Sequence, residues 1–212
     1  MKITINVSRI FCFLFLSFMT TSFVYAEEKF QEILATPELL QQLQNEGGLV
    51  VYMRHGTTDN TRPDRAPSVD LNDCNTQRML SDAGRELAKQ VGAYIKQAKI
   101  PLDRPIVSPM CRAKETAELA FGVIATDEGL TYSGSMTSAE KVPVLERTKA
   151  LLSAPVPKGS NRLLVAHAPN LMDIMGYFPK EGTLVVFKPA GEQGFTYLGS
   201  IPPTHWDKLL TK

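Results

Sequence analysis

Apolar positions in this chain form short runs that alternate with longer, more polar stretches. Mostly apolar runs occur at residues 49–53, 104–107, 162–166, 183–187 and 195–198. Short runs of this kind are typical of strands, and a nearly continuous run such as 49–53 indicates a strand covered on both faces. Gly191 and Gly194 lie between the last two runs and favour a hairpin there.

Capping residues and glycines mark helices between these runs. Hydroxyl groups stand at the predicted starts, as Thr36 before Pro37, Ser81 before Asp82, and Thr137 in a capping box with Glu140. The first predicted helix covers residues 37–45 and ends before Gly47 and Gly48. The second starts at Asp82 and has an apolar stripe at Leu87, Val91, Tyr94 and Ile95. Three more are predicted at residues 111–121, which Gly122 ends, at 138 to about 152, and in a short stretch from Pro169.

This alternation predicts an α/β fold with three layers, a mainly parallel central sheet flanked by helices. No repeat or linker divides residues 27–212, so we expect them to form a single domain. In such sheets ligands bind beyond the carboxyl ends of the strands.

The N-terminus has the pattern of a secretory signal. Lys2 and Arg9 precede the apolar run of residues 10–19, and small residues lead to Ala26. The alternative, an uncleaved membrane anchor, is disfavoured because the run is shorter than the roughly 20 residues that a span needs. We therefore predict that residues 1–26 are a cleaved signal peptide, that the mature protein has no membrane span, and that it is periplasmic or secreted.

Charge and cysteine content narrow the partners and the redox state. The formal net charge of the chain is +1, and loss of Lys2 and Arg9 makes it −1, which provides no basic surplus for nucleic acid. Two cysteines, Cys74 and Cys111, remain after cleavage. An even count in an oxidising compartment favours one disulfide over two buried thiols.

Three of the predicted strands are followed by residues that suit phosphate chemistry. Arg54-His55-Gly56 follows the first, Ser108 to Arg112 the second, and His167 the third. Parallel strands end at the same edge, so two imidazoles and two guanidinium groups are expected to meet there. An arginine fork donates two hydrogen bonds to adjacent phosphate oxygens, and a neutral imidazole nitrogen can attack phosphorus.

At these residues the sequence resembles the histidine phosphatase superfamily, in the branch related to phosphoglycerate mutases, and in particular a small secreted bacterial member. Arg54-His55-Gly56 matches the signature, residues 108–117 match "SPxxRAxxTA", and His167 stands where the second histidine belongs. The resemblance implies that His55 is the phosphorylated nucleophile, and that Arg54, Arg112 and His167 form the phosphate pocket. Arg78 resembles a further phosphate-binding arginine.

One part of the family pattern is missing. Many members have a glutamate after the third strand that protonates the leaving group, but residues 127–134 place no carboxylate cleanly there, and no Asp follows His167. The candidate acids are Asp59, Asp127, Glu128 and Glu140. A missing acid matters least when the leaving group is already good.

Other polar residues have simpler readings. Residues 57–80 form a long polar loop, and loops of this length are usually functional. Three charged residues of this loop, Arg62, Arg65 and Asp70, are either exposed to solvent or bind a substrate. His205 is expected to be a packing residue, and a metal site of three histidines is disfavoured because the two arginines would repel a cation.

These observations predict a metal-independent phosphomonoesterase that needs no cofactor and acts through phosphohistidine at His55. Its partner would be a small phosphorylated substrate in the cell envelope, and a sugar phosphate is compatible with that location. A phosphomutase is disfavoured by the missing acid and the secretion signal. The alternative from another class is a non-catalytic protein that binds phospholigands on a decayed phosphatase scaffold.

Overall fold

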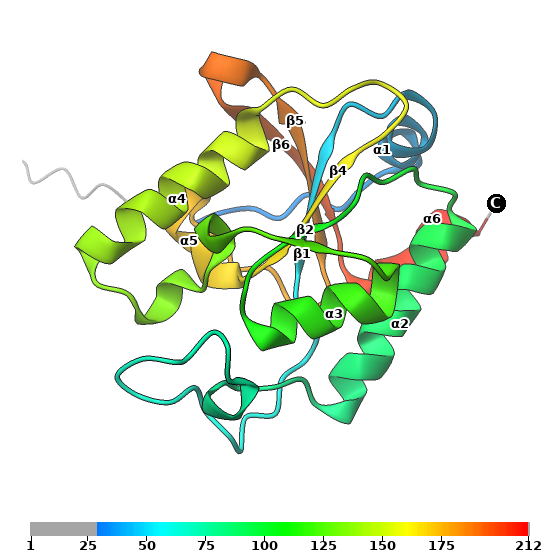
Figure 1. The fold of residues 1–212 in the computed structure, drawn as a ribbon. Helices are drawn as coiled ribbons and strands as arrows, with labels where there is room; N and C mark the ends of the chain where they lie inside the picture. The colour runs from blue at the N-terminus through cyan, green and yellow to red at the C-terminus, as the bar shows by residue number, and fades with distance from the viewer. Residues whose placement is uncertain (1–28, 212) are drawn as a thin grey trace, which may run out of the picture.

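The structure, a computed structural model, describes residues 29–211 and contains one six-stranded sheet with helices on both faces (Figure 1). The strands are β1 (Val50–Arg54), β2 (Ile106–Val107), β3 (Ala125–Thr126), β4 (Arg162–Ala166), β5 (Leu184–Pro189) and β6 (Phe195–Ile201), in the order β3-β2-β4-β1-β5-β6. The first four pair in parallel, whereas β5 is antiparallel to β1 and to β6. The predicted α/β fold is confirmed, with an antiparallel hairpin at one edge.

Helices cover the sheet on both faces. α1 (Pro37–Gln41), α2 (Asp82–Gln97), α3 (Cys111–Phe121) and α6 (Trp206–Leu210) pack on one face, and α4 (Ser138–Ser153) and α5 (Ala168–Met175) on the other (Figure 1). The predicted signal peptide, residues 1–26, lies outside the described residues. Within 29–211, no helix has the length and apolar character needed to cross a membrane.

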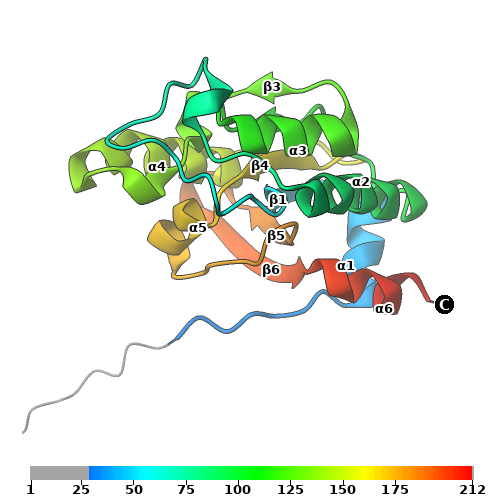
Figure 2. The ribbon, with the colours of Figure 1, turned by 90° about the horizontal axis from the view of Figure 1, so that it is seen from below.

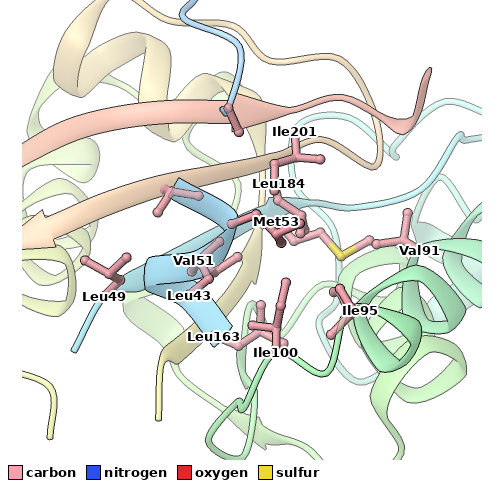
Figure 3. Close-up of a cluster of buried hydrophobic side chains, with 14 of the residues drawn as sticks. Leu43, Leu49, Val51, Met53, Val91, Ile95, Ile100, Leu163, Leu184 and Ile201 are labelled. Atoms are coloured by element: carbon pink, nitrogen blue, oxygen red, sulfur yellow. The ribbon is translucent and has the colours of Figure 1, made fainter. Parts of the chain in front are cut away.

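Strand β1 shows why the core has two halves. Successive side chains of a strand point to opposite faces. Val51 and Met53 therefore join the cluster with Val91 and Ile95 of α2 (Figure 3). Val50 and Tyr52, in contrast, join the cluster under α4 and α5. Because both faces are buried, the run carries no polar alternation.

The predicted caps are present at the helix starts. The side chains of Thr36, Ser81 and Thr137 each accept a backbone N–H at the start of their helices, and Thr137 with Glu140 completes the capping box. The first helix continues past α1 as a π-helical turn over Gln42–Glu46, and Gly47 follows with a positive φ of 64°. The sequence did not predict β3, which has two residues, or α6, whose Trp206 is buried and stacks on Tyr94 with 5.5 Å between ring centroids.

The long polar loop is tied to the fold at its far end. Residues 57–80 run from the end of β1 to the start of α2 and contain one 3₁₀ turn, Cys74–Thr76 (Figure 2). A disulfide joins Cys74 to Cys111, the first residue of α3. The Cys111 backbone N–H also donates to Oε1 of Gln77 at 2.8 Å. The loop is therefore held against the helix that carries Arg112.

Removal of this disulfide is expected to destabilise the protein strongly. Its cysteines are 37 residues apart, and the chain-entropy relation for a loop of that size gives about 4 kcal/mol. The double variant Cys74→Ala/Cys111→Ala should lose about that much free energy of unfolding in urea titrations. A reductant should produce a similar loss in the native protein and none in the variant. A loss well under about 1 kcal/mol would mean that the loop is held by its other contacts.

Candidate active site

The three reactive segments meet at one edge of the sheet. β2, β4 and β1 are adjacent and parallel, and Ser108, His167 and His55 directly follow them. The His55 backbone N–H donates to the carbonyl of Ala166 at 3.1 Å, and the rings of His55 and His167 are 5.2 Å apart between centroids. The strand-end geometry expected from the sequence is present.

His55 is oriented so that one ring nitrogen is available. The side chain is buried, and its Nδ1 lies 2.8 Å from the carbonyl oxygen of Gly56. A carbonyl only accepts, so the proton is on Nδ1, and Nε2 keeps its lone pair. Burial lowers the pKa of His55 well below its ordinary value, and the charge of Arg112 lowers it further. This imidazole is therefore neutral near pH 7.

His167 has the opposite arrangement. Its Nε2 lies 2.8 Å from Oγ of Ser108, which itself accepts the Met110 backbone N–H at 3.3 Å. When the Ser108 hydroxyl donates to Nε2, the His167 proton is on Nδ1, which has no partner among the described residues. The Tyr52 hydroxyl bonds both the backbone N–H of His167, at 3.0 Å, and its carbonyl, at 2.8 Å. Burial lowers the pKa of His167, as do the charges of Arg112 and then of a protonated His55.

Two buried neutral histidines make the stability of the protein fall as the pH falls. In the unfolded chain each histidine takes up a proton below about pH 6.5, whereas the folded protein resists protonation, so the unfolded state binds more protons. Between about pH 6.5 and 5, each should cost roughly 1.4 kcal/mol per pH unit. Urea titrations should show that His167→Gln reduces this slope by about that amount. Parallel slopes for native and variant proteins would contradict the prediction.

Arg112 is the most buried arginine of the site. Its side chain is 0% exposed, its Nη1 donates to Oδ1 of Asp64 at 3.0 Å, and its guanidinium lies over the ring of Tyr132 at 5.0 Å. Nε and Nη2 have no partner among the described residues. These two N–H groups are parallel, so Arg112 can donate two hydrogen bonds to adjacent oxygens of one oxyanion.

Arg54 and Arg78 are held by other contacts. Nη1 of Arg54 donates to the carbonyl of Pro179 at 2.7 Å, and Nη2 to Oε1 of Glu181 at 3.4 Å. Nη1 of Arg78 donates to Oδ1 of Asn60 at 3.2 Å. Both arginines keep a buried Nε without a partner in the described part of the chain.

Unpaired donors are concentrated at this site. Within residues 29–211, nine buried side-chain N or O atoms lack a partner, and five are Nε of Arg54 and Arg78, Nε and Nη2 of Arg112, and Nδ1 of His167. Buried polar groups are normally paired, so a cluster of unpaired donors indicates a ligand that supplies acceptors. The charges of the three arginines lower the pKa of both histidines, so all three lie close enough to act on both rings. The arrangement can bind an oxyanion.

The turn after His55 depends on two glycines that touch. A Cβ on Gly56 would lie 2.6 Å from the carbonyl oxygen of Gly84, and one on Gly84 would lie 1.9 Å from that of Thr57. The first turn of α2 therefore packs directly on the backbone that carries His55. The Gly56 N–H also donates to Oγ1 of Thr116 in α3 at 3.0 Å.

The four carboxylates considered from sequence lie in other contacts. Asp127 pairs with Arg147 at 2.7 Å, Asp59 accepts from Thr61, Glu140 completes the α4 cap, and Glu128 is exposed in a 3₁₀ turn. Among the described contacts, none of the four reaches the arginines or histidines of the site. Sequence reasoning missed the two carboxylates that do, Asp64 on Arg112 and Glu181 on Arg54.

A cavity of about 410 Å³ adjoins the site. Its walls come from the loop residues Asp64 to Val69 and Leu71, from Met110, and from Thr131, Tyr132, Ser135, Met136 and Glu140. Of the loop charges singled out in the sequence, Arg65 lines this cavity, whereas Asp70 accepts the backbone N–H of Asn72 within the loop.

Two other sequence expectations concern metals and His205. Nε2 of His205 bonds the carbonyl of Ala35 at 2.9 Å, so this histidine packs near α1 rather than at the site. Across residues 29–211, no group of three or more His, Cys, Asp or Glu side chains is arranged to hold a metal ion.

Comparisons with known proteins agree with this fold and site. Residues 50–131 match the family model of the histidine phosphatase superfamily (branch 1). Among solved structures, the chain is similar to the protein histidine phosphatase SixA complexed with tungstate, with 18% identity and a TM-score of 0.50 over 74% of this chain and 98% of that one. It is also similar to a putative alpha-ribazole-5'-P phosphatase from Escherichia coli str. K-12 substr. MG1655, with 16% identity and a TM-score of 0.51 over 74% and 98%. No curated protein sequence gives a significant match.

These structural likenesses show the fold, and the matched segment contains both Arg54-His55-Gly56 and residues 108–117. The match over residues 50–131 therefore supports the resemblance to the histidine phosphatase superfamily that the motifs indicate.

Proposed function

We propose that this protein is a metal-independent phosphomonoesterase that acts through a phosphohistidine intermediate on His55. The observation that carries the proposal is a buried, neutral His55 with a free Nε2, in a site whose arginines and second histidine keep five unpaired side-chain nitrogens. A nucleophile and an oxyanion site at the same point are what phosphoryl transfer needs.

The geometry supports a role for each group. Nε2 of His55 attacks phosphorus, and the N–P bond forms as the bond to the leaving oxygen breaks. Charge then spreads over three equatorial oxygens, which the unpaired N–H groups of Arg54, Arg78, Arg112 and His167 stabilise. Water attacks the phosphohistidine in a second step and releases phosphate. The arginines supply the positive charge that a metal ion provides in other phosphatases.

The substrate proposed is a small phosphorylated compound. A cavity of about 410 Å³ is within the range of small-molecule sites. Its walls combine apolar side chains with Tyr132, Arg65 and two carboxylates. A sugar phosphate is compatible with this mixed apolar and polar lining, and it is a substrate class found in the cell envelope.

The proposed location is the periplasm or the exterior. Its support is the sequence pattern of residues 1–26 and the disulfide, which persists in oxidising compartments. N-terminal sequencing of the protein from a periplasmic fraction should give Glu27 as the first residue. An intact N-terminus recovered from the membrane fraction would contradict the proposal.

A panel of phosphate esters tests the activity. We expect turnover of at least one ester at full rate in excess EDTA, with inorganic phosphate as a competitive inhibitor. Activity that disappears in EDTA and returns with a divalent cation would overturn the metal-independent mechanism. Tight binding of phosphate esters with no turnover across the panel would instead support the non-catalytic reading.

A further inference from the structure

The site contains a carboxylate that the motifs do not predict, on the same arginine that offers its fork to phosphate. Oδ1 of Asp64 accepts from Nη1 of Arg112 at 3.0 Å and from the backbone N–H of Arg78 at 2.8 Å. Oδ2 of Asp64 has no hydrogen-bond partner among the described residues, and the side chain keeps 24% of its exposure. One oxygen is fixed and the other is free to carry a proton.

The planar shape of Arg112 sets the distance between this carboxylate and the phosphoryl group. Nε and Nη2 form one edge of the guanidinium and have no partner among the described residues, whereas Nη1 donates a hydrogen bond to Asp64. A phosphoryl group bound on the free edge and the carboxylate on Nη1 would therefore be neighbours around one rigid group. This places Asp64 beside the reacting phosphate without a change in the position of Arg112.

Asp64 also lines the cavity that adjoins the site. His55 is buried with 2% exposure, whereas Asp64 lines the cavity. In-line displacement requires the leaving oxygen to depart opposite the attacking Nε2. Asp64 and Tyr132 both contact Arg112 and both line the cavity, so a leaving group that extends into the cavity would pass beside Asp64.

Resting on the function proposed above, we infer that Asp64 is the proton donor to the leaving group and the base in the second step. Phosphate monoesters such as phosphoserine have a second pKa of about 6, so the bound substrate can supply the proton, which moves to Oδ2. As the P–O bond breaks, that proton passes to the leaving oxygen and a neutral alcohol departs. The Asp64 carboxylate then takes a proton from the attacking water, the N–P bond breaks, and the proton leaves on the released phosphate.

The other carboxylates near the site are less suited. Glu181 holds Arg54 at 3.4 Å and does not line the cavity. Glu140 lines the cavity, but Thr137 holds it in the α4 cap, and among the described contacts it reaches no arginine of the site. Asp127 is engaged by Arg147 through two N–H groups, at 3.0 and 2.7 Å.

The test is the dependence of kcat/KM on the leaving group in Asp64→Asn, which preserves the shape of the side chain. Purified full-length mature protein is assayed with 4-nitrophenyl phosphate, whose leaving group needs little protonation, and with β-glycerophosphate, whose alkoxide needs a proton. We expect Asp64→Asn to lose about 10²- to 10³-fold on the alkyl ester and less than about tenfold on the aryl ester. Asp64→Glu should recover part of the loss on the alkyl ester.

Glu181→Gln is the matched control, since it removes the other carboxylate that pairs with a site arginine. It should change kcat/KM by the same factor for both esters. An equal loss for both esters in Asp64→Asn, or no loss, would overturn the inference, because Asp64 would then only hold Arg112 or do nothing. If the native protein hydrolysed neither ester and formed no phosphoprotein, the proposed function would fail first, and this inference with it.

Discussion

Replacement of His55 by alanine is expected to lower kcat/KM by roughly 10⁴- to 10⁶-fold, the range found when a covalent nucleophile is removed. Nε2 of His55 is the only unprotonated ring nitrogen that the described site presents to phosphorus, because Nε2 of His167 bonds Ser108. The remaining arginine donors should still bind an anion. Inorganic phosphate should therefore bind the variant, as measured by calorimetry, while initial rates on every ester collapse.

His205→Ala is the matched control for this prediction. His205 bonds Ala35 and lies away from the site, so its loss should leave kcat/KM within about twofold. Activity of His55→Ala within tenfold of the native value would exclude His55 as the nucleophile.

Replacement of Arg112 by lysine is expected to lower kcat/KM by about 10²- to 10³-fold, although the charge is kept. A lysine is a point charge and cannot donate from two parallel N–H groups as Nε and Nη2 do. The variant should also bind tungstate, an oxyanion of similar charge, more weakly, because the fork is needed for any tetrahedral oxyanion. Steady-state kinetics and tungstate inhibition measure both effects.

Arg147→Lys tests whether an arginine-to-lysine change is harmful in general. Arg147 is 53% exposed and pairs with Asp127 on the surface, so its replacement should change kcat/KM little. A similar effect of the two substitutions would mean that the fork of Arg112 is not used in the reaction.

The parts of the site that follow strands were accessible from the sequence. Buried parallel strands appear as apolar runs, and the residue after each run must lie at the carboxyl edge, so the sequence alone predicts that His55, Ser108 and His167 lie together. Helix starts were equally visible, because Thr36, Ser81 and Thr137 cap them through local hydrogen bonds. Local chemistry determined these features.

The partners contributed by loops were not accessible in the same way. Asp64 reaches Arg112 across 48 positions of sequence, and Tyr132 lies over the same guanidinium from a different loop. No periodicity relates such residues, since the path of the loop depends on the disulfide and on Gln77. Strand β3 escaped prediction because it has only two residues, Ala125 and Thr126, which are too few to show a periodic pattern.

The central claim, that His55 carries the phosphoryl group, is tested most directly by trapping the intermediate. Native protein is mixed with a ³²P-labelled ester, denatured in alkali within the first turnover, and digested, and the labelled peptide is identified. The account predicts one labelled peptide, which contains His55 and loses its phosphate in acid but not in base. Label that is stable in acid, label on a peptide without His55, or turnover with no labelled protein at any time would contradict it.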